Sequence, residues 1–500
     1  MNDNALIAPL PPAASPGARL GAQPRAAVRL VRIELRRNPV IAMLPLAFAL
    51  FWYQAYRHIM ALPPMWNVRA MTMQNDAPLD FAMPVTAAAA WVGWREQRRG
   101  VTELLSGTPR SPWTRRLAAW AATTCWALAG YLVCVAVVYG ITARQASWGG
   151  PLWWPAAVGA TGIPALSAFG VVVGAMLPSR FTTPLLVIVA FFGLGYSSTA
   201  AVSGHSFWQL SPLVAGWAGI GADPGVATFY RYLPDLSIAQ VMFLGGVTLA
   251  LLGVLGLPSR PWRIRACAAA LAAAGLAAGG TAVALAGTAR LDVHGMTVIP
   301  ALHDGVGDRP VPYTPVCGGT GVPICVHPAY AAFLPAVTEA LEPALRAVAG
   351  LRGAPASLRQ RAQIYAQGPG TAILVPSATG SGSALLLPPP PGTEGAISGG
   401  YSSELAADVA VPIVSNVLGV PPDGPATPAQ QAILSALTHL PGGQQARALG
   451  VQPGLLPAPG SAAAAAAQRF AALSIAAQHA WLAAHVAALR AGQIGVAELP

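Results

Sequence analysis

The chain has 500 residues, of which 54% are hydrophobic and only 9% are charged, and its mean hydropathy is +0.52. Soluble domains contain about 25% charged residues, so this composition excludes an ordinary soluble protein and predicts a membrane protein. The formal net charge of +11 is due to arginine, because the chain contains no lysine. The arginines cluster beside apolar segments, so membrane topology explains them and no nucleic-acid partner is expected.

The N-terminal residues 1–38 are expected to lie on the cytoplasmic side of the membrane. Residues 1–24 are rich in Pro, Ala and Gly and lack the apolar core of a signal peptide, which predicts a disordered leader. Residues 25–38 predict an amphipathic helix with Arg29, Arg32 and Arg36 opposite its apolar stripe. Such a helix lies in the membrane interface, where anionic headgroups attract its arginines.

Seven apolar segments are about as long as a helix that crosses a bilayer. We expect these spans at residues 39–62, 79–94, 118–142, 152–177, 182–202, 237–257 and 266–289. A Pro-rich outer loop is expected before the second span, and an amphipathic outer segment is expected at residues 203–236. Sixteen arginines fall at the ends assigned to the cytoplasm and four in the short outer loops. By the positive-inside rule, the N-terminus is then inside and residues 290–500 are outside.

The cytoplasmic loop at residues 95–117 is rich in arginine. Within it, residues 97–106 predict one short amphipathic helix, after which Pro109 and Pro112 turn the chain back toward the membrane. The loop is either a topogenic basic hairpin or a handle that a soluble partner binds. The residues expected to contact such a partner are Arg95, Glu96, Arg98, Arg99, Glu103, Leu104 and Leu105.

The pattern E-x-R-R-G-x-x-E-L-L-x-x-x-P, which begins at Glu96, resembles the first cytoplasmic loop of ABC exporter permeases. In that superfamily this loop contains the coupling helix that contacts the ATPase subunit. A connecting helix precedes the first span of those permeases, and a pair of short re-entrant helices precedes the sixth. The resemblance covers roughly residues 25–257 of this chain.

This resemblance implies a permease subunit in a bacterial plasma membrane that moves an apolar or amphipathic substrate. It also implies a homodimer, or a heterodimer with a second permease, and a separate ABC ATPase subunit that binds and hydrolyses ATP. Without lysine the chain cannot form a phosphate-binding G-x-x-x-x-G-K-[ST] loop. We therefore expect no catalytic residue and no cofactor on this chain.

Residues 290–500 contain no run of about 20 apolar residues, which a span would need. We expect a strand near residues 291–300, a helix at 329–349, strands near 371–376 and 383–387, and helices at 402–418, 428–440 and 462–491. The predicted fold class is therefore a polytopic α-helical membrane protein of about seven transmembrane helices. Its C-terminal ectodomain is expected to be α+β or mainly helical.

Cys317 and Cys325 bracket a short loop on the expected oxidising side of the membrane, which favours a disulfide. A zinc site that adds His327 is the alternative, but its ligand spacing is poor, and no metal is expected.

The order of elements in this region is similar to zinc-peptidase domains fused to some bacterial ABC permeases. At the place of their H-E-x-x-H motif this chain has Glu404 and Asp408 without histidine. The alternative function is therefore a membrane-anchored sensory or degenerate peptidase-like ectodomain without transport activity. An ion-coupled carrier is disfavoured, because almost no ionisable residue falls within the expected spans.

Overall fold

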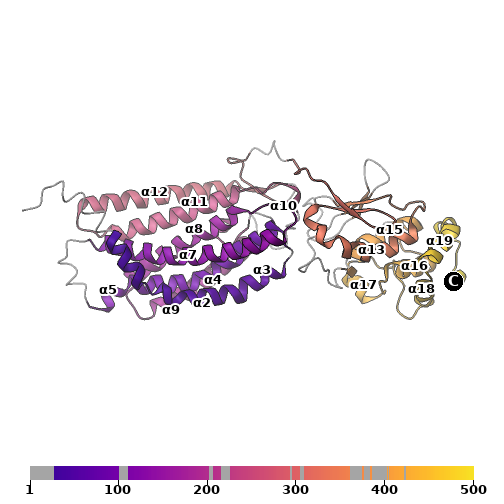
Figure 1. Ribbon diagram of the computed structural model, residues 1–500, viewed down its shortest axis with the longest axis horizontal. Coiled ribbons are helices and arrows are strands. Elements are labelled where there is room, and N and C mark those ends of the chain that lie inside the picture. Colours follow the sequence, from indigo (N-terminus) through magenta and orange to yellow (C-terminus); the bar gives the residue numbers. More distant parts are fainter. Residues whose placement is uncertain are drawn as a thin grey trace, which may run out of the picture.

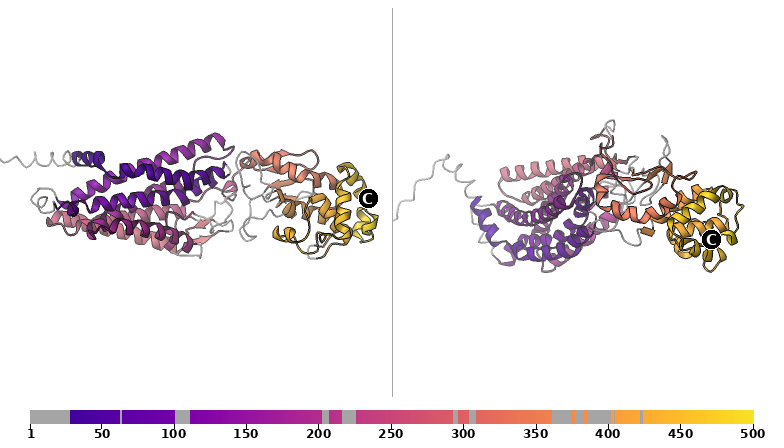
Figure 2. Two further views of the ribbon diagram at one scale, coloured as in Figure 1. Left: turned by 90° about the horizontal axis from the view of Figure 1, so that it is seen from below. Right: turned by 45° about the vertical axis from the view of Figure 1, so that its right-hand side comes forward.

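The computed structural model describes residues 28–62, 64–100, 111–201, 207–215, 226–292, 296–303, 309–360, 374–376, 383–385, 402–403, 405–421 and 424–500. These residues form a bundle of long helices with a smaller C-terminal domain at one end (Figure 1). Residues 28–37 form a helix at the opposite end of the bundle, as the views in Figure 2 also show.

Six helices among the described residues are long and apolar enough to cross a membrane. The first is formed by α2 (Val40–Leu50), η1 (Phe51–Tyr56) and α3 (Arg57–Ala61) in succession. The others are α7 (Pro112–Gln145), α8 (Trp153–Met176), α9 (Thr182–Ala201), α11 (Asp235–Gly256) and α12 (Trp262–Gly287). They coincide with six of the seven predicted spans. Between α9 and α11, the described residues include two short helices, η2 (Phe207–Leu210) and α10 (Val226–Phe229).

The remaining predicted span, residues 79–94, falls within α4 (Trp66–Gly93) except for its last residue, Trp94. This helix has 28 residues and lies inside the bundle, where it packs against α2, α7, α8 and α9 (Figure 1). It is not among the six apolar helices. The predicted outer loop before residue 79 is wrong, because residues 66–78 are already helical. Neighbouring helices cover most of this segment, and the helix continues through Pro78.

Two ionisable side chains are nevertheless buried within the helical bundle, although α4 is not one of the six candidate spans. On α4, Arg69 and Asp80 are only 1% and 2% exposed. Arg69 donates to Oε1 of Gln145 at 2.7 Å and to the carbonyl of Leu62 at 3.4 Å. One carboxylate oxygen of Asp80 has no hydrogen-bond partner among the described residues. These two buried side chains weaken the argument against an ion-coupled carrier.

Glycine allows α4 and α8 to approach backbone to backbone. A Cβ atom on Gly174 would lie 2.3 Å from the carbonyl oxygen of Ala90, and one on Gly93 would lie 2.4 Å from that of Val171. Carbon and oxygen in close contact are normally about 3.3 Å apart, so no larger residue fits at either position. Gly93 is the last residue of α4, so this contact fixes the point at which the chain leaves the bundle.

The C-terminal domain contains a mixed sheet. The strands are β3 (Val316–Gly318), β4 (Ile324–Val326), β5 (Leu358–Gln360), β6 (Leu374–Pro376) and β7 (Ser383–Leu385), in the order β3-β4-β5-β7-β6. The β4–β5 and β5–β7 pairs are parallel, whereas β3–β4 and β6–β7 are antiparallel. Before this sheet, β1 (Arg290–Leu291) pairs with β2 (Thr297–Val298), so the single strand predicted at 291–300 is in fact two antiparallel strands.

Helices pack beside this sheet around the largest apolar core of the chain. They are η3 (Pro328–Phe333), α13 (Leu334–Val348), η5 (Ala406–Ala410), α15 (Val411–Leu418), α16 (Pro428–Thr438), α17 (Gln444–Ala448), α18 (Ala462–Ala471), α19 (Ile475–Arg490) and η6 (Val496–Glu498). The helix predicted at residues 462–491 is divided in two. Ser474 interrupts it, because its hydroxyl accepts from the Ala477 amide and caps the start of α19.

A buried histidine lies where the C-terminal domain meets the bundle. The ring of His327 packs against Trp148, Phe229 and Tyr313, with ring centroids 5.0, 5.0 and 4.3 Å away. Its Nδ1 accepts a hydrogen bond from the Ala329 amide at 3.1 Å. Burial lowers the pKa of His327 to about 4, so the ring is neutral at pH 7.

We expect Gly174→Ala to force α4 and α8 apart and to lower the melting temperature of the detergent-solubilised protein by several degrees. Gly193→Ala in α9 is the control, because a Cβ there meets no atom within 4 Å. Helix propensity alone would make both changes neutral or stabilising. Equal melting temperatures for the two variants would show that the α4–α8 contact is looser than described.

We also expect the protein to lose stability as the pH falls from 7 to 5. The folded-state pKa of His327, about 4, lies below the ordinary value of 6.5, so the unfolded chain binds more protons in this window. The loss amounts to about 2 kcal/mol for this residue. His327→Phe should flatten the pH dependence of chemical unfolding by that amount, and His439→Asn, at an exposed histidine, should not. Equal slopes in all three proteins would contradict the burial argument.

Candidate functional site at the α5 end of the bundle

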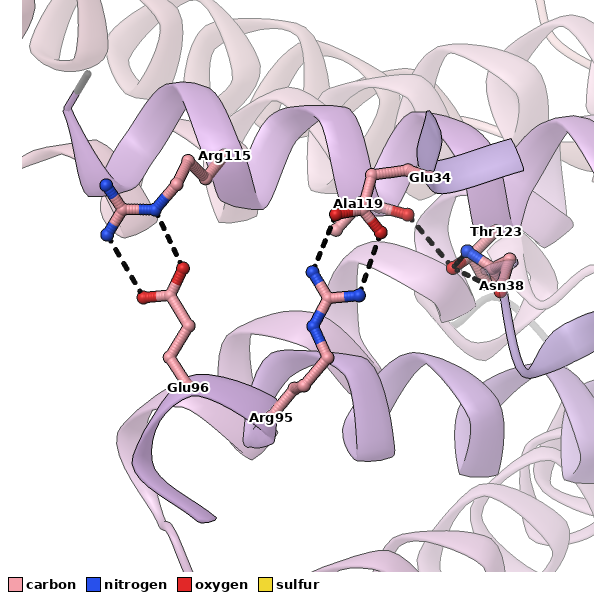
Figure 3. Close-up of polar contacts among 7 residues, drawn as sticks. All are labelled: Glu34, Asn38, Arg95, Glu96, Arg115, Ala119 and Thr123. Carbon is pink, nitrogen blue, oxygen red and sulfur yellow. Dashed lines mark hydrogen bonds and ion pairs between the residues drawn. The ribbon is translucent and has the colours of Figure 1, made fainter. Parts of the chain in front are cut away.

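Three segments meet at the end of the bundle opposite the C-terminal domain. They are the N-terminal helix of residues 28–37, the short helix α5 (Arg95–Arg98) and the start of α7 (Figures 1 and 3). Only Trp94 separates α5 from the end of α4. The close α4–α8 packing therefore sets the position of α5, and polar side chains attach α5 to the other two segments.

Glu34 and Arg95 form a two-point ion pair between the N-terminal helix and α5. The two terminal nitrogens of Arg95 donate to the two carboxylate oxygens of Glu34 at 2.9 and 2.7 Å (Figure 3). Glu34 is only 8% exposed. Hydrogen bonding to Glu34 raises the pKa of Arg95 above its ordinary value, although burial acts in the opposite direction. Arg95 therefore stays charged, and loss of either side chain would leave the other shielded and without its partner.

Glu96 and Arg115 form a second ion pair, which joins α5 to α7. The Nε and Nη2 atoms of Arg115 donate to the carboxylate of Glu96 at 2.8 and 3.3 Å (Figure 3). Successive residues of a helix project about 100° apart, so Arg95 and its neighbour Glu96 reach different elements. The four residues of α5 are thereby attached on two sides.

The end of the N-terminal helix is also fastened to α7. Asn38 donates to the hydroxyl of Thr123 at 2.9 Å, and its side-chain oxygen accepts from the Val40 amide at 3.0 Å. The indole of Trp126 donates to the carbonyl of Leu35 at 2.8 Å. These bonds satisfy backbone groups that the ends of two consecutive helices leave open.

Two further side chains connect this corner to the rest of the bundle. Gln97 of α5 donates to the Ala175 carbonyl of α8 at 3.2 Å. Trp113 of α7 donates to the Leu252 carbonyl of α11 at 2.9 Å. A displacement of α5 would therefore be felt by α4, α7 and α8, and through α7 by α11.

A pocket of about 610 Å³ lies between the N-terminal helix and α5, and we call it the arginine pocket. Its apolar lining residues are Leu30, Ile33, Pro39, Trp91 and Val92. Its charged lining residues are Glu34, Arg37, Arg95, Glu96, Arg98, Arg99 and Arg115. The guanidinium of Arg98 lies over the ring of Trp91, 3.6 Å from the centroid. Burial, and then the charges of Arg99 and Arg95, lower the pKa of Arg98.

The residues predicted to contact a partner are only partly within the described chain. Arg95, Glu96 and Arg98 lie on α5, and Arg99 lies in the turn after it. Glu103, Leu104 and Leu105 fall outside the described residues. The prediction of one helix over residues 97–106 is wrong at its start, because α5 ends at Arg98. Gly100 then adopts a positive φ of 64°, which stops the helix.

On the N-terminal helix, the predicted arginines Arg29, Arg32 and Arg36 are exposed. Sequence reasoning missed Glu34 and Asn38, which make the contacts that position this helix. One signal was available. Glu34 is the only acidic residue in a helix that is otherwise basic and apolar, and an isolated acid of this kind often has a basic partner elsewhere.

In the C-terminal domain, Cys317 and Cys325 face each other across β3 and β4 and are joined by a disulfide. Their sulfur atoms are therefore not available for the alternative zinc site with His327. No group of three or more His, Cys, Asp or Glu side chains could hold a metal ion within the part of the chain that the structure describes.

Comparison with known protein families, curated proteins and solved structures finds no match to this chain.

We expect the Glu34–Arg95 pair to be coupled strongly. Glu34→Gln and Arg95→Gln should each lower the melting temperature, because each leaves one shielded charge unpaired. The double variant should be more stable than the sum of the single effects implies, with a coupling energy of about 1–3 kcal/mol. Glu34→Gln combined with Arg99→Gln is the control cycle, because Arg99 makes no ion pair among the described residues. If the stability effects of the single changes are additive in both cycles, the Glu34–Arg95 pair does not stabilise the contact between the N-terminal helix and α5.

Proposed function

We propose that this chain is the permease subunit of an ABC exporter, driven by a separate ATPase subunit that docks at α5 and the loop after it. The observation that supports this best is the double attachment of α5. A short charged helix at one end of the bundle is ion-paired to the N-terminal helix through Arg95 and to α7 through Glu96. A coupling element needs such links, because a force that it receives must reach the spans.

The position of α4 extends this argument. It is the most enclosed helix of the bundle, and α5 follows it directly. Movement of α5 by a bound ATPase would therefore act on the central helix and not on a peripheral one. In the proposed cycle, ATP binding and hydrolysis on the partner rock α4 and α7 together and open a path for an apolar or amphipathic substrate. A homodimer, or a heterodimer with a second permease, would form that path.

We place the chain in a bacterial plasma membrane, and the arginine bias supports an orientation with the α5 end in the cytoplasm. In that orientation the C-terminal domain lies outside the cell. The Cys317–Cys325 disulfide fits an oxidising exterior. There the domain would bind the exported substrate or a partner at the cell surface.

An ion-coupled carrier is the second candidate, and Asp80 is the observation that favours it. Its carboxyl group is buried in the bundle and has one oxygen without a partner among the described residues. Buried carboxyl groups among membrane helices often bind a proton or a cation during transport. In this alternative, transport needs no ATPase and is abolished by Asp80→Asn. In the exporter, transport needs ATP and the partner subunit.

We expect the purified chain to show no ATP hydrolysis by itself and to copurify with its ABC ATPase subunit when the two are coexpressed. Arg99→Glu reverses an exposed charge in the turn after α5 and should reduce the copurified ATPase at least tenfold. This result follows if the partner presents acidic side chains to the loop. The control is Arg260→Glu, an exposed arginine in the α11–α12 connection at the same end of the bundle.

Vigorous ATP hydrolysis by the isolated chain would contradict the proposal. Equal loss of the ATPase in both variants would show that the partner is attracted by the net positive charge of this end of the bundle and not by a specific contact at the loop. Unchanged copurification with Arg99→Glu would leave the loop with a topogenic role, and transport without any ATPase would favour the carrier.

A further inference from the structure

The arginine pocket contains more positive charge than its own carboxylates neutralise. Five guanidinium groups and two carboxylates line it, which leaves a formal excess of three positive charges. Arg95 holds Glu34 and Arg115 holds Glu96, each through two hydrogen bonds. The other three arginines, Arg37, Arg98 and Arg99, make no ion pair among the described residues. The surplus is therefore concentrated on these three side chains.

One donor atom of Arg98 has no acceptor in the part of the chain that the structure describes. Its Nη1 atom is shielded from solvent, yet it has no hydrogen-bond partner within the described residues. The central carbon of the guanidinium lies 3.6 Å from the centroid of the Trp91 ring. A shielded donor without an acceptor costs free energy, and an oxygen atom from a ligand would recover it. Guanidinium groups bind phosphate oxygens well because their paired N–H groups match the phosphate geometry.

The apolar wall of the pocket favours a phosphate group that belongs to an amphiphile over a free phosphate ion. Ile33 and Trp91 are 48% and 45% exposed, and both lie beside the arginines. A free anion such as inorganic phosphate needs no such wall. An amphiphile with a phosphate head and an acyl tail would cover both surfaces together. The pocket also lies where the amphipathic helix of residues 28–37 meets the first apolar helix, which is the depth expected for lipid headgroups.

We propose that the arginine pocket binds the headgroup of an anionic phospholipid. Arg37, Arg98 and Arg99 hold the phosphate, and the acyl chains leave along Ile33 and Trp91. Basic pockets between helices at a membrane surface are a recurrent site for anionic lipid heads. The bound lipid would join the N-terminal helix to α5 alongside the Glu34–Arg95 pair, and would stiffen the corner through which α5 is attached. The proposal does not depend on the ATPase, because the pocket is formed by this chain alone.

The test measures the thermal stability of the full-length chain in detergent while dioleoyl phosphatidylglycerol is added. The melting temperature should rise in a saturable way with this lipid. It should not rise with dioleoyl phosphatidylcholine, which has no net charge, or with the same concentration of inorganic phosphate. An equal rise with phosphatidylcholine would overturn the proposal in favour of general lipid solvation, and one with phosphate in favour of a free-anion site.

Two variants of equal charge locate the site. The pocket variant combines Arg37→Gln, Arg98→Gln and Arg99→Gln. The control combines Arg29→Gln, Arg32→Gln and Arg36→Gln, which removes three exposed arginines of the N-terminal helix that do not line the pocket. Each pocket arginine should contribute about fivefold to lipid affinity, so the pocket variant should bind about a hundredfold more weakly. The control should bind within a few-fold of the wild type.

Equal weakening in both triple variants would overturn the proposal, since a diffuse basic surface would then explain the effect. If the pocket triple variant does not fold, the single change Arg99→Gln provides the measurement, because Arg99 is exposed in a turn. It should weaken binding of phosphatidylglycerol about fivefold, and Arg36→Gln should leave it unchanged. Unchanged binding by Arg99→Gln would equally overturn the assignment.

Discussion

The arrangement of the bundle depends on the need to cover α4. This helix carries Asn67, Arg69, Gln74 and Asp80, whose polar groups would be costly to expose to hydrocarbon. Other segments supply partners for most of them. Asn67 donates to Thr228 at 3.1 Å, and Gln74 donates to the side chain of Gln240 at 3.2 Å and to the carbonyl of Val214 at 2.8 Å. The polar helix therefore lies in the middle and the apolar helices surround it. Glycine at the α4–α8 contact then lets two backbones meet where side chains would not fit.

The central position of α4 accounts for the properties of the α5 corner. The chain leaves the bundle at Gly93, and within a few residues it makes two ion pairs in different directions. These pairs use both carboxylates that line the arginine pocket and so leave three arginines for other ligands. The same charges attach α5 on two sides and leave the positive surplus on which the proposed lipid site depends. An ATPase at α5 and a phospholipid in the pocket would act on the same corner and would both lie close to Arg99, the first as the source of movement and the second as a stabilising ligand.

At the other end of the bundle, aromatic rings and a hydrogen bond join the C-terminal domain to the bundle. His327 packs among Trp148, Phe229 and Tyr313, and Ser147 donates to the carbonyl of Pro328 at 2.8 Å. Two of these rings belong to connections between bundle helices: Trp148 follows α7, which reaches the α5 corner, and Phe229 precedes α11. The disulfide lies in the first hairpin of the sheet, which leads directly to His327. If the bundle helices move, they therefore act on a part of the C-terminal domain that the disulfide cross-links.

The sequence by itself determined the class of the protein and six of its long helices. A run of about 20 apolar residues must form a helix in a bilayer, because the backbone has no other partner for its polar groups. The sequence did not determine that α4 begins at Trp66, since Pro78 and several polar residues favoured a loop. Nor did it determine the partners in the α5 corner. Periodicity detects neighbours within one helix, whereas Glu34 and Arg95 are 61 residues apart and Gln74 and Gln240 are 166 apart. Only the packing of complete helices brings such residues together. That packing therefore decides whether a buried polar side chain destabilises the bundle or forms a hydrogen bond that stabilises it.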